Sequence, residues 1–206
     1  MRKLIVSINS SLNGVVTGPA DDKTNFMIWA QAVFDDDSMH EAFLENFDTV
    51  DTILLGRATY EALVRQWPKV KEWPNVSDVQ LRIGEKINTA PKIVVTGKHP
   101  LKSLEWGEFE PPTQLTGTNI EEQIKEIKEA DGGDIITFGS PTLVQFLTNA
   151  NLVDEYRILV HPVIVGEDGY KRLFENIVGR KDLKLLSPQT FEHGVVLMCY
   201  EFVKLK

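Results

Sequence analysis

The chain has 206 residues, of which 42% are hydrophobic and 25% are charged, and its formal net charge at pH 7 is −8. These values exclude a fibrous repeat and a disordered chain, and the negative charge disfavours nucleic acid and anionic membranes as partners. The length fits one large domain, so we expect a single domain over residues 1–206.

The sequence also indicates where the protein works. The N-terminal residues contain no apolar core of the length that a signal peptide needs, and no later run approaches membrane-spanning length. The single cysteine, Cys199, lies in an apolar run, where a buried structural thiol is expected. We therefore expect a cytoplasmic protein without a membrane partner.

The first elements are a strand, a turn and two helices. Residues 3–9 are rich in aliphatic side chains and predict a central strand, after which residues 10–14 form a turn. Apolar residues then recur every three or four positions over residues 26–47, with an interruption at Asp35-Asp36-Asp37-Ser38, which predicts a short helix and a longer one. The adjacent aspartates lack the alternating oxygens of a calcium loop, so we predict a helix cap and no metal site.

Residues 51–65 predict a buried strand, a tight turn at Gly56 and a helix from residue 58 to residue 64. Arg57 lies at the start of that helix, where a cation opposes the helix dipole unless an anion binds beside it. Guanidinium suits a phosphate through paired hydrogen bonds, and a surface salt bridge is the alternative.

The middle of the chain adds a third strand with a polar end. Proline follows Trp67 and Trp73, which predicts an irregular segment, and residues 79–87 predict a helix. The strand at residues 91–96 ends in Thr96-Gly97-Lys98, whose hydroxyl, backbone and ammonium suit an anion. Residues 105–117 are expected to form a loop, and residues 119–130 an amphipathic helix.

The stretch from Asp134 to Leu152 predicts a strand, a glycine turn and a helix. Residues 135–138 are apolar or β-branched, Gly139 permits a tight turn, Ser140 is a preferred N-cap and Pro141 suits the first helical position. Such a turn directs backbone N–H groups and a helix dipole at one place, which suits a phosphate. An ordinary strand-to-helix connection is the alternative.

The C-terminal part predicts strands only. Residues 153–165 form a long strand in which Pro162 indicates an edge position or a bulge, and residues 183–190 and 195–203 form an antiparallel hairpin. The chain is therefore an α/β protein finished by a hairpin. Ligands of α/β sheets bind beyond the carboxyl ends of the strands, and the three polar strand ends favour a phosphorylated dinucleotide, although no G-x-G-x-x-G motif is present.

Four segments in this order resemble the motifs of the dihydrofolate reductase-like superfamily: residues 54–61, 92–96, 138–143 and 152–157. The sequence is most similar to the C-terminal reductase domain of the bifunctional riboflavin biosynthesis enzyme and its stand-alone bacterial relatives. This resemblance implies a three-layer α/β/α fold with a central, mostly parallel sheet. It also implies a homodimer, and NADPH bound across the strand ends as a hydride donor to a C=N or C=O group.

The resemblance also assigns residues to the site. Three groups of residues are expected to contact the cofactor. They are Gly139, Ser140, Thr142 and Leu143 at the start of the helix that follows Ser140; Gly56, Arg57 and Thr59 at the start of the helix that follows Gly56; and Thr96 and Lys98 at the end of the strand at residues 91–96. Asn13 stands where the family motif Ser-Leu-Asp-Gly has its aspartate, and we assign it with Trp29 to the substrate. Asp36 and Asp37 are the catalytic candidates, because dihydrofolate reductases use a carboxylate of the first helix; Asp35 and Glu41 are the other available acids.

These expectations lead to one main hypothesis and two alternatives. The main hypothesis is an NADPH-dependent reductase of a pterin or aminopyrimidine heterocycle. An aminouracil reductase needs a pocket for ribose phosphate, whereas a folate reductase needs an apolar slot and a carboxylate. The alternatives are a noncatalytic protein that keeps the nucleotide site and a dimeric scaffold that binds no cofactor.

Overall fold

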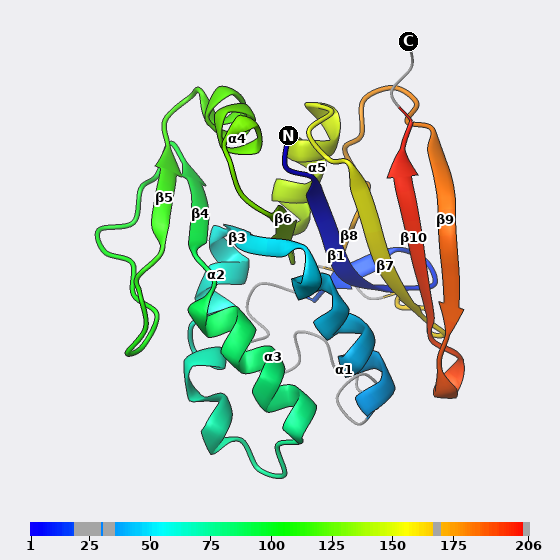
Figure 1. Ribbon diagram of the computed structural model, residues 1–206. Helices are drawn as coiled ribbons and strands as arrows, with labels where there is room; N and C mark the ends of the chain where they lie inside the picture. Colours follow the sequence, from blue (N-terminus) through cyan, green and yellow to red (C-terminus); the bar gives the residue numbers. More distant parts are fainter. Residues whose placement is uncertain (19–29, 31–35, 167–169, 204–206) are drawn as a thin grey trace.

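The computed structural model describes residues 1–18, 30, 36–166 and 170–203 (Figure 1). Its centre is an eight-stranded sheet in the order β5-β4-β3-β6-β1-β7-β10-β9, in which the first six strands are parallel and β10 runs antiparallel to both of its neighbours. The strands are β1 (Leu4–Ser11), β3 (Val50–Gly56), β4 (Lys92–Gly97), β5 (Thr113–Thr116), β6 (Asp134–Thr137), β7 (Glu155–His161), β9 (Leu183–Thr190) and β10 (Val196–Phe202). Two short strands, β2 (Val15–Thr17) and β8 (Lys171–Arg172), pair separately. The predicted mostly parallel sheet with a C-terminal hairpin is confirmed.

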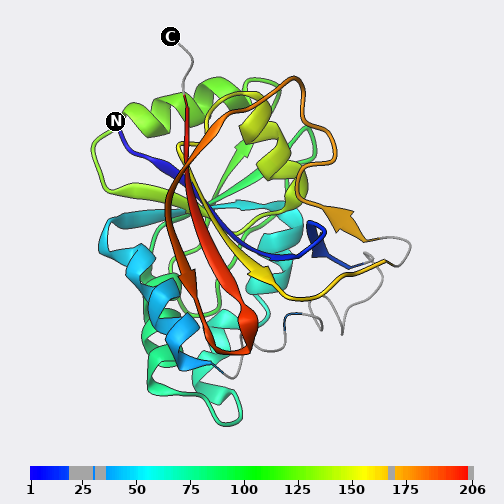
Figure 2. The ribbon, with the colours of Figure 1, turned by 90° about the vertical axis from the view of Figure 1, so that its right-hand side faces the viewer.

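Helices cover both faces of this sheet and complete three layers (Figures 1 and 2). One face carries α4 (Ile120–Glu129) and α5 (Pro141–Asn149), and the other carries α1 (Asp37–Leu44), α2 (Arg57–Leu63) and α3 (Asp78–Thr89). The short 3₁₀ helices η2 (Glu45–Asp48), η3 (Trp67–Glu72) and η4 (Glu192–Gly194) lie between the other elements.

The strand residues alternate between two hydrophobic cores, as the pleat of a strand requires. On β1, Leu4 and Val6 pack with α4 and α5, whereas Ile5 packs with α2 and α3 on the opposite face. Burial on both faces explains why these strands have continuous aliphatic sequences, the pattern that predicted buried strands.

Three details differ from the prediction. The expected loop at residues 105–117 contains β5, a short polar edge strand paired with β4. The segment expected to be irregular around Trp67 and Trp73 instead forms the 3₁₀ helix η3, which ends at Glu72, just before Trp73. The prediction from Pro162 is wrong, because β7 lies between β1 and β10 and ends at His161, so that the proline follows the strand.

The short helix predicted around residues 26–34 lies outside the described residues, apart from Ala30. Within the described ranges, none of the helices has the length and apolar character that crossing a membrane requires.

Candidate functional site

The strands β3 and β6 are neighbours, and their carboxyl ends meet at two glycines. The backbone N–H of Gly56 donates a hydrogen bond to the carbonyl of Gly139 over 3.0 Å. A Cβ atom at Gly56 would lie 2.8 Å from the backbone nitrogen of Ser140, closer than real contacts allow, so this approach requires glycine. The Gly139–Ser140 peptide bond is cis. The contact brings the starts of α2 and α5 together.

Both helix starts suit an anion. Ser140 is the N-cap of α5, as the sequence predicted, and Gly56, predicted as a tight turn, is the N-cap of α2. Within the described part of the chain, no side chain caps either helix, and neither first turn contains an acidic residue. First-turn N–H groups and the helix dipole therefore face outward without a competing carboxylate.

The residues of α2 lie beside this point. Thr59 faces α5, because its Oγ1 lies 3.3 Å from where a Cβ at Gly139 would be. The Nε of Arg57 donates to Oε1 of Glu61 over 2.9 Å, and both side chains are nearly half exposed. The salt bridge considered for Arg57 is therefore present. Its contact with a phosphate stays a prediction, and an exposed pair of this kind contributes little to stability.

The third strand end lies on the next strand, β4. The Oγ1 of Thr96 donates to the carbonyl of Leu115 over 3.2 Å, and Lys98 is exposed. A Cβ at Gly97 would meet nothing within 4 Å, so space is open beside this turn. Because β4 pairs with β3 in parallel, these groups belong to the same edge of the sheet as Gly56.

Thr142 and Leu143 of α5 differ in which of their atoms a ligand can contact. Thr142 is exposed, whereas the Leu143 side chain is 5% exposed and belongs to the core that contains Leu4 and Val6. A contact from Leu143 to a ligand would therefore come from its backbone.

Asp36 is the N-cap of α1, which confirms the predicted helix cap. Its Oδ1 accepts hydrogen bonds from the backbone N–H groups of Ser38, at 2.8 Å, and Met39, at 3.3 Å. The other oxygen, Oδ2, is buried and has no hydrogen-bond partner among the described residues. Hydrogen bonding from Ser38, chiefly from its side chain, holds the pKa of Asp36 below its usual range, although burial opposes this. Asp36 is therefore ionised at neutral pH and accepts hydrogen bonds.

The other substrate-side candidates differ from Asp36. Asp37 is exposed, and its Oδ1 accepts a hydrogen bond from Ser77 Oγ over 2.9 Å, which ties α1 to α3. The amide of Asn13 donates to the carbonyl of Val165 over 2.7 Å and accepts from its N–H over 3.1 Å, so it joins two chain segments. Trp29 lies outside the described residues. The catalytic and substrate roles of these residues stay predictions.

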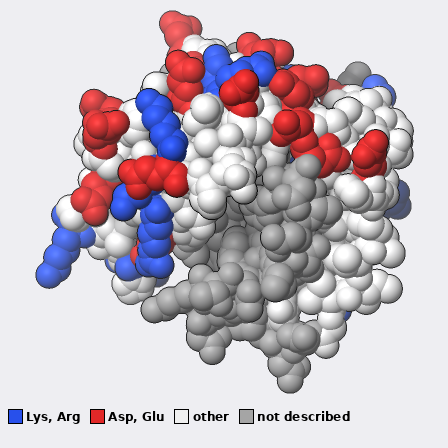
Figure 3. Space-filling view, turned by 90° about the horizontal axis from the view of Figure 1, so that it is seen from below, with Lys and Arg blue, Asp and Glu red and all other residues white. Residues whose placement is uncertain are grey.

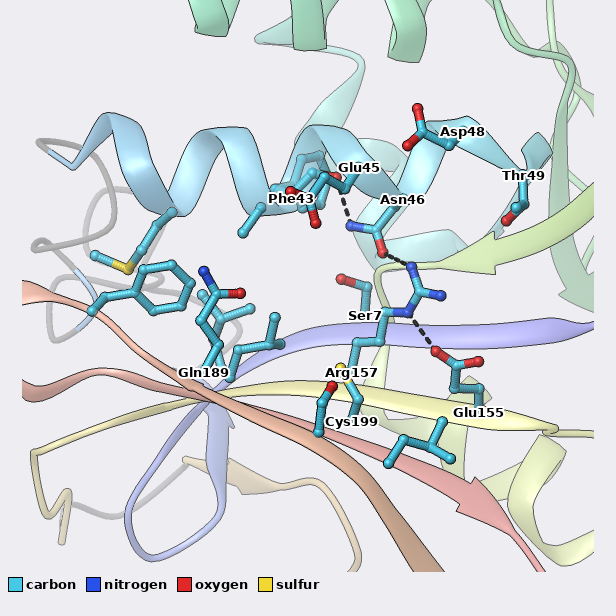
Figure 4. Close-up of a pocket in the computed structure, with 17 residues that line it drawn as sticks. Ser7, Phe43, Glu45, Asn46, Asp48, Thr49, Glu155, Arg157, Gln189 and Cys199 are labelled. Carbon is cyan, nitrogen blue, oxygen red and sulfur yellow. Dashed lines mark hydrogen bonds and ion pairs between the residues drawn. The ribbon is translucent and has the colours of Figure 1, made fainter.

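A cavity of about 400 Å³ lies between the α1–η2 segment and strands β1, β7, β9 and β10 (Figure 4). Arg157 lies between two partners: its Nε donates to Glu155 Oε1 and its Nη1 donates to Asn46 Oδ1, both over 2.6 Å. The sequence analysis missed this cavity because its walls come from distant segments. The signal present in the sequence was Glu155 and Arg157, two charged residues on one face of the strand predicted at residues 153–165.

His161 is a further buried polar group on the same face of β7. It is 1% exposed, and its Nε2 lies 3.0 Å from Oδ1 of Asn9 on β1. Burial lowers the pKa of His161 to about 4, so the ring is neutral at pH 7.

Comparison with known proteins agrees with this architecture. The chain matches the family model described as the RibD C-terminal domain over residues 2–197. A relative, the uncharacterized protein YyaP of Bacillus subtilis strain 168, is 27% identical over 201 residues, which cover 98% of this chain and 95% of the relative.

Two solved structures are similar in fold. A putative riboflavin biosynthesis protein from Shewanella sp. PV-4 has a TM-score of 0.70 at 18% identity, and the match covers 98% of this chain and 99% of that one. Dihydrofolate reductase from Enterococcus faecalis, complexed with NADP(H), has a TM-score of 0.56 at 13% identity, with coverage of 98% and 97%. The chain therefore belongs to the RibD C-terminal domain family and has the dihydrofolate reductase-like fold.

Proposed function

We propose that this protein is an NADPH-dependent reductase that transfers hydride to a C=N or C=O group of a pterin or aminopyrimidine heterocycle. The observation that carries the proposal is the contact between Gly56 and Gly139, which brings two helix starts together at the carboxyl edge of the sheet. Backbone N–H groups at such a place suit a pyrophosphate. The shared fold with a dihydrofolate reductase complexed with NADP(H) supports the same assignment.

The residues at this edge fit such a cofactor. The first turn of α5 at Ser140 and Thr142 would hold the pyrophosphate, with Arg57 and Thr59 beside it. Thr96 and Lys98, on the next strand, would hold the 2′-phosphate that distinguishes NADPH from NADH. When bound, NADPH supplies the hydride, and the protein contributes binding and orientation.

Asp36 is the carboxylate that we propose for the substrate. Its Oδ2 is buried, has no partner in the described ranges and carries charge at neutral pH, so it can accept hydrogen bonds from ring N–H or amino groups. Asp37 is less suited, because it is exposed and already accepts a hydrogen bond from Ser77.

We also propose that the protein forms a homodimer through β9. Every residue of this edge strand is exposed, and Leu183, Leu185 and Leu186 are between 37% and 47% exposed. In Figure 3 the lower right of the described surface, on the side where Figure 1 places β9 and β10, is mostly uncharged. The leucines on this edge strand supply apolar surface for a second copy of the chain, against the edge-protecting effect of Lys184 and Pro188 on the same strand.

Analytical ultracentrifugation tests the dimer. Leu185→Lys should give a monomer, because it places a charge in the proposed interface, whereas Val178→Lys, at a side chain that is 73% exposed, should not change the mass. A monomeric unmodified protein at micromolar concentration would remove this proposal.

Fluorescence titration with NADPH and NADH tests the cofactor site. Saturable binding that prefers NADPH, and that Gly139→Asp abolishes, is the expected result, because a carboxylate at the start of α5 repels phosphate. The control is Gly166→Asp, since a Cβ at Gly166 would meet nothing within 4 Å. Failure to bind at millimolar nucleotide would overturn the proposal. Tight binding without oxidation by any heterocycle would favour the noncatalytic alternative.

A further inference from the structure

The cavity beneath α1 adjoins the strand end that we assign to the cofactor. Phe138 directly precedes Gly139, and its ring centroid lies 5.4 Å from that of Phe43, which lines the cavity. Ser7 also lines it, on the strand β1 whose parallel neighbour β6 leads into Gly139. The cavity therefore extends to Phe43, whose ring contacts the residue that precedes Gly139.

The polar end of the cavity is built around Arg157 (Figure 4). Glu155 and Asn46, its two partners, are 6% and 3% exposed, so the guanidinium is held in place. A guanidinium has five N–H groups, and those partners take two of them. Within the part of the chain that the structure describes, the remaining N–H groups can donate to a ligand carbonyl.

The charges around this end disfavour an anionic ligand. Glu45, Asp48 and Glu155 line the cavity against a single lining cation, Arg157. Lys3 approaches from outside the lining and lies 3.6 Å from Glu155 Oε2, so carboxylates still outnumber cations. A phosphate placed here would meet a wall of net negative charge.

The rest of the cavity is apolar and of small-ligand size. Met39, Phe43, Leu159 and Phe191 supply aromatic and aliphatic surface for a flat ring. A volume of about 400 Å³ falls in the range of small-molecule sites.

Resting on the proposed reductase function, we infer that this cavity, whose lining residue Met39 donates its backbone N–H to Asp36, receives the acceptor and selects a neutral, unphosphorylated heterocycle whose carbonyl accepts hydrogen bonds from Arg157. A ribose phosphate substituent is excluded by the surrounding carboxylates. Of the two substrate types that the sequence left open, the cavity therefore favours an apolar slot over a ribose phosphate pocket.

Two commercially available probes test this inference without turnover. Uridine is neutral and carries ring carbonyls, and uridine 5′-monophosphate differs from it only by the phosphate. In NMR titrations we expect uridine to shift the amide signals of Ser7, Gln189 and Cys199, and the monophosphate to bind about tenfold more weakly because of like-charge repulsion.

Variants identify the groups responsible. Arg157→Gln should weaken uridine binding about tenfold through loss of charged hydrogen bonds, whereas Arg180→Gln, in an exposed pair with Asp182, should not change it. Ala42→Leu fills the cavity from α1 while keeping Arg157, and it should also prevent binding. Replacing Glu45 by Gln and Asp48 by Asn should reduce the difference between the affinities for uridine and for uridine 5′-monophosphate.

Equal or tighter binding of the monophosphate would overturn the inference, and so would uridine shifts that map elsewhere. The inference would also be wrong if a second copy of the chain closes the cavity. In that case uridine would bind only to a monomeric variant. NADPH titration of the same samples separates the two proposals. Uridine binding without NADPH binding would refute the proposed reductase function, whereas NADPH binding without uridine binding would refute only the proposal that this cavity is the acceptor site.

Discussion

Gly56→Ala tests whether the contact between β3 and β6 builds the cofactor site. The new methyl group would lie 2.8 Å from the backbone nitrogen of Ser140 and 2.6 Å from its Oγ. The hydroxyl can rotate away, but the nitrogen can reach ordinary contact at 3.4 Å only if the strand end and the start of α5 separate by about 0.6 Å.

The expected effect follows from that displacement. Overpacking of this size costs about 1–3 kcal/mol of unfolding free energy. Losing one charge-assisted hydrogen bond to a phosphate costs about 1.5 kcal/mol, which corresponds to about tenfold weaker NADPH binding. Urea denaturation and NADPH fluorescence titration measure the two effects separately.

The matched control is Gly166→Ala, because a Cβ at Gly166 meets nothing within 4 Å. It should leave both stability and NADPH binding unchanged. If folded Gly56→Ala protein binds NADPH with unchanged affinity, the two helix starts do not hold the cofactor together, and the reasoning is refuted.

Three further predictions concern charged groups. Arg57→Ala should weaken NADPH and NADH alike, because Arg57 lies beside the pyrophosphate that both nucleotides carry, whereas Arg82→Ala, which breaks a similarly exposed salt bridge, should weaken neither; unchanged affinities in Arg57→Ala would contradict the role of Arg57. Burial lowers the pKa of His161 from 6.5 to about 4, so as the pH drops the unfolded chain binds a proton on this ring before the folded chain does. The free energy of unfolding should therefore fall between pH 6.5 and pH 4, by about 3 kcal/mol in all. Urea denaturation at several pH values should show that loss in the unmodified protein and a smaller one in His161→Asn. Burial likewise lowers the pKa of Lys92 from 10.5 to about 8, so stability should rise between pH 8 and pH 10.5 as the folded state releases this proton first. Lys92→Met should remove that rise, and an unchanged pH profile in the variant would show that Lys92 does not titrate as described.

Much of the fold could be predicted because its signals are local. The sequences around Gly56 and Gly139 each contain a buried strand, a glycine and a helix start, and both were predicted close to their observed bounds. The short, polar strand β5 could not be predicted in this way, because its identity as a strand comes from pairing with β4 at the sheet edge.

The site was less predictable, because it depends on distant segments. The hydrogen bond between Gly56 and Gly139 joins two strands whose pairing is a property of the whole sheet. The cavity around Arg157 depends on how α1 and η2 lie over four different strands. Asn13 was considered only for a ligand, although in the structure its amide bonds to the backbone of Val165.

The central position of β1 has a consequence for how the chain folds during synthesis. Leu4 pairs with Ile135 and Ile5 pairs with Glu155, so β1 finds its partners only after β6 and β7 have been synthesised. Such long-range pairing slows folding and leaves an aliphatic strand exposed in the nascent chain. Truncation before Glu155 should therefore give an aggregating fragment and not a smaller folded domain.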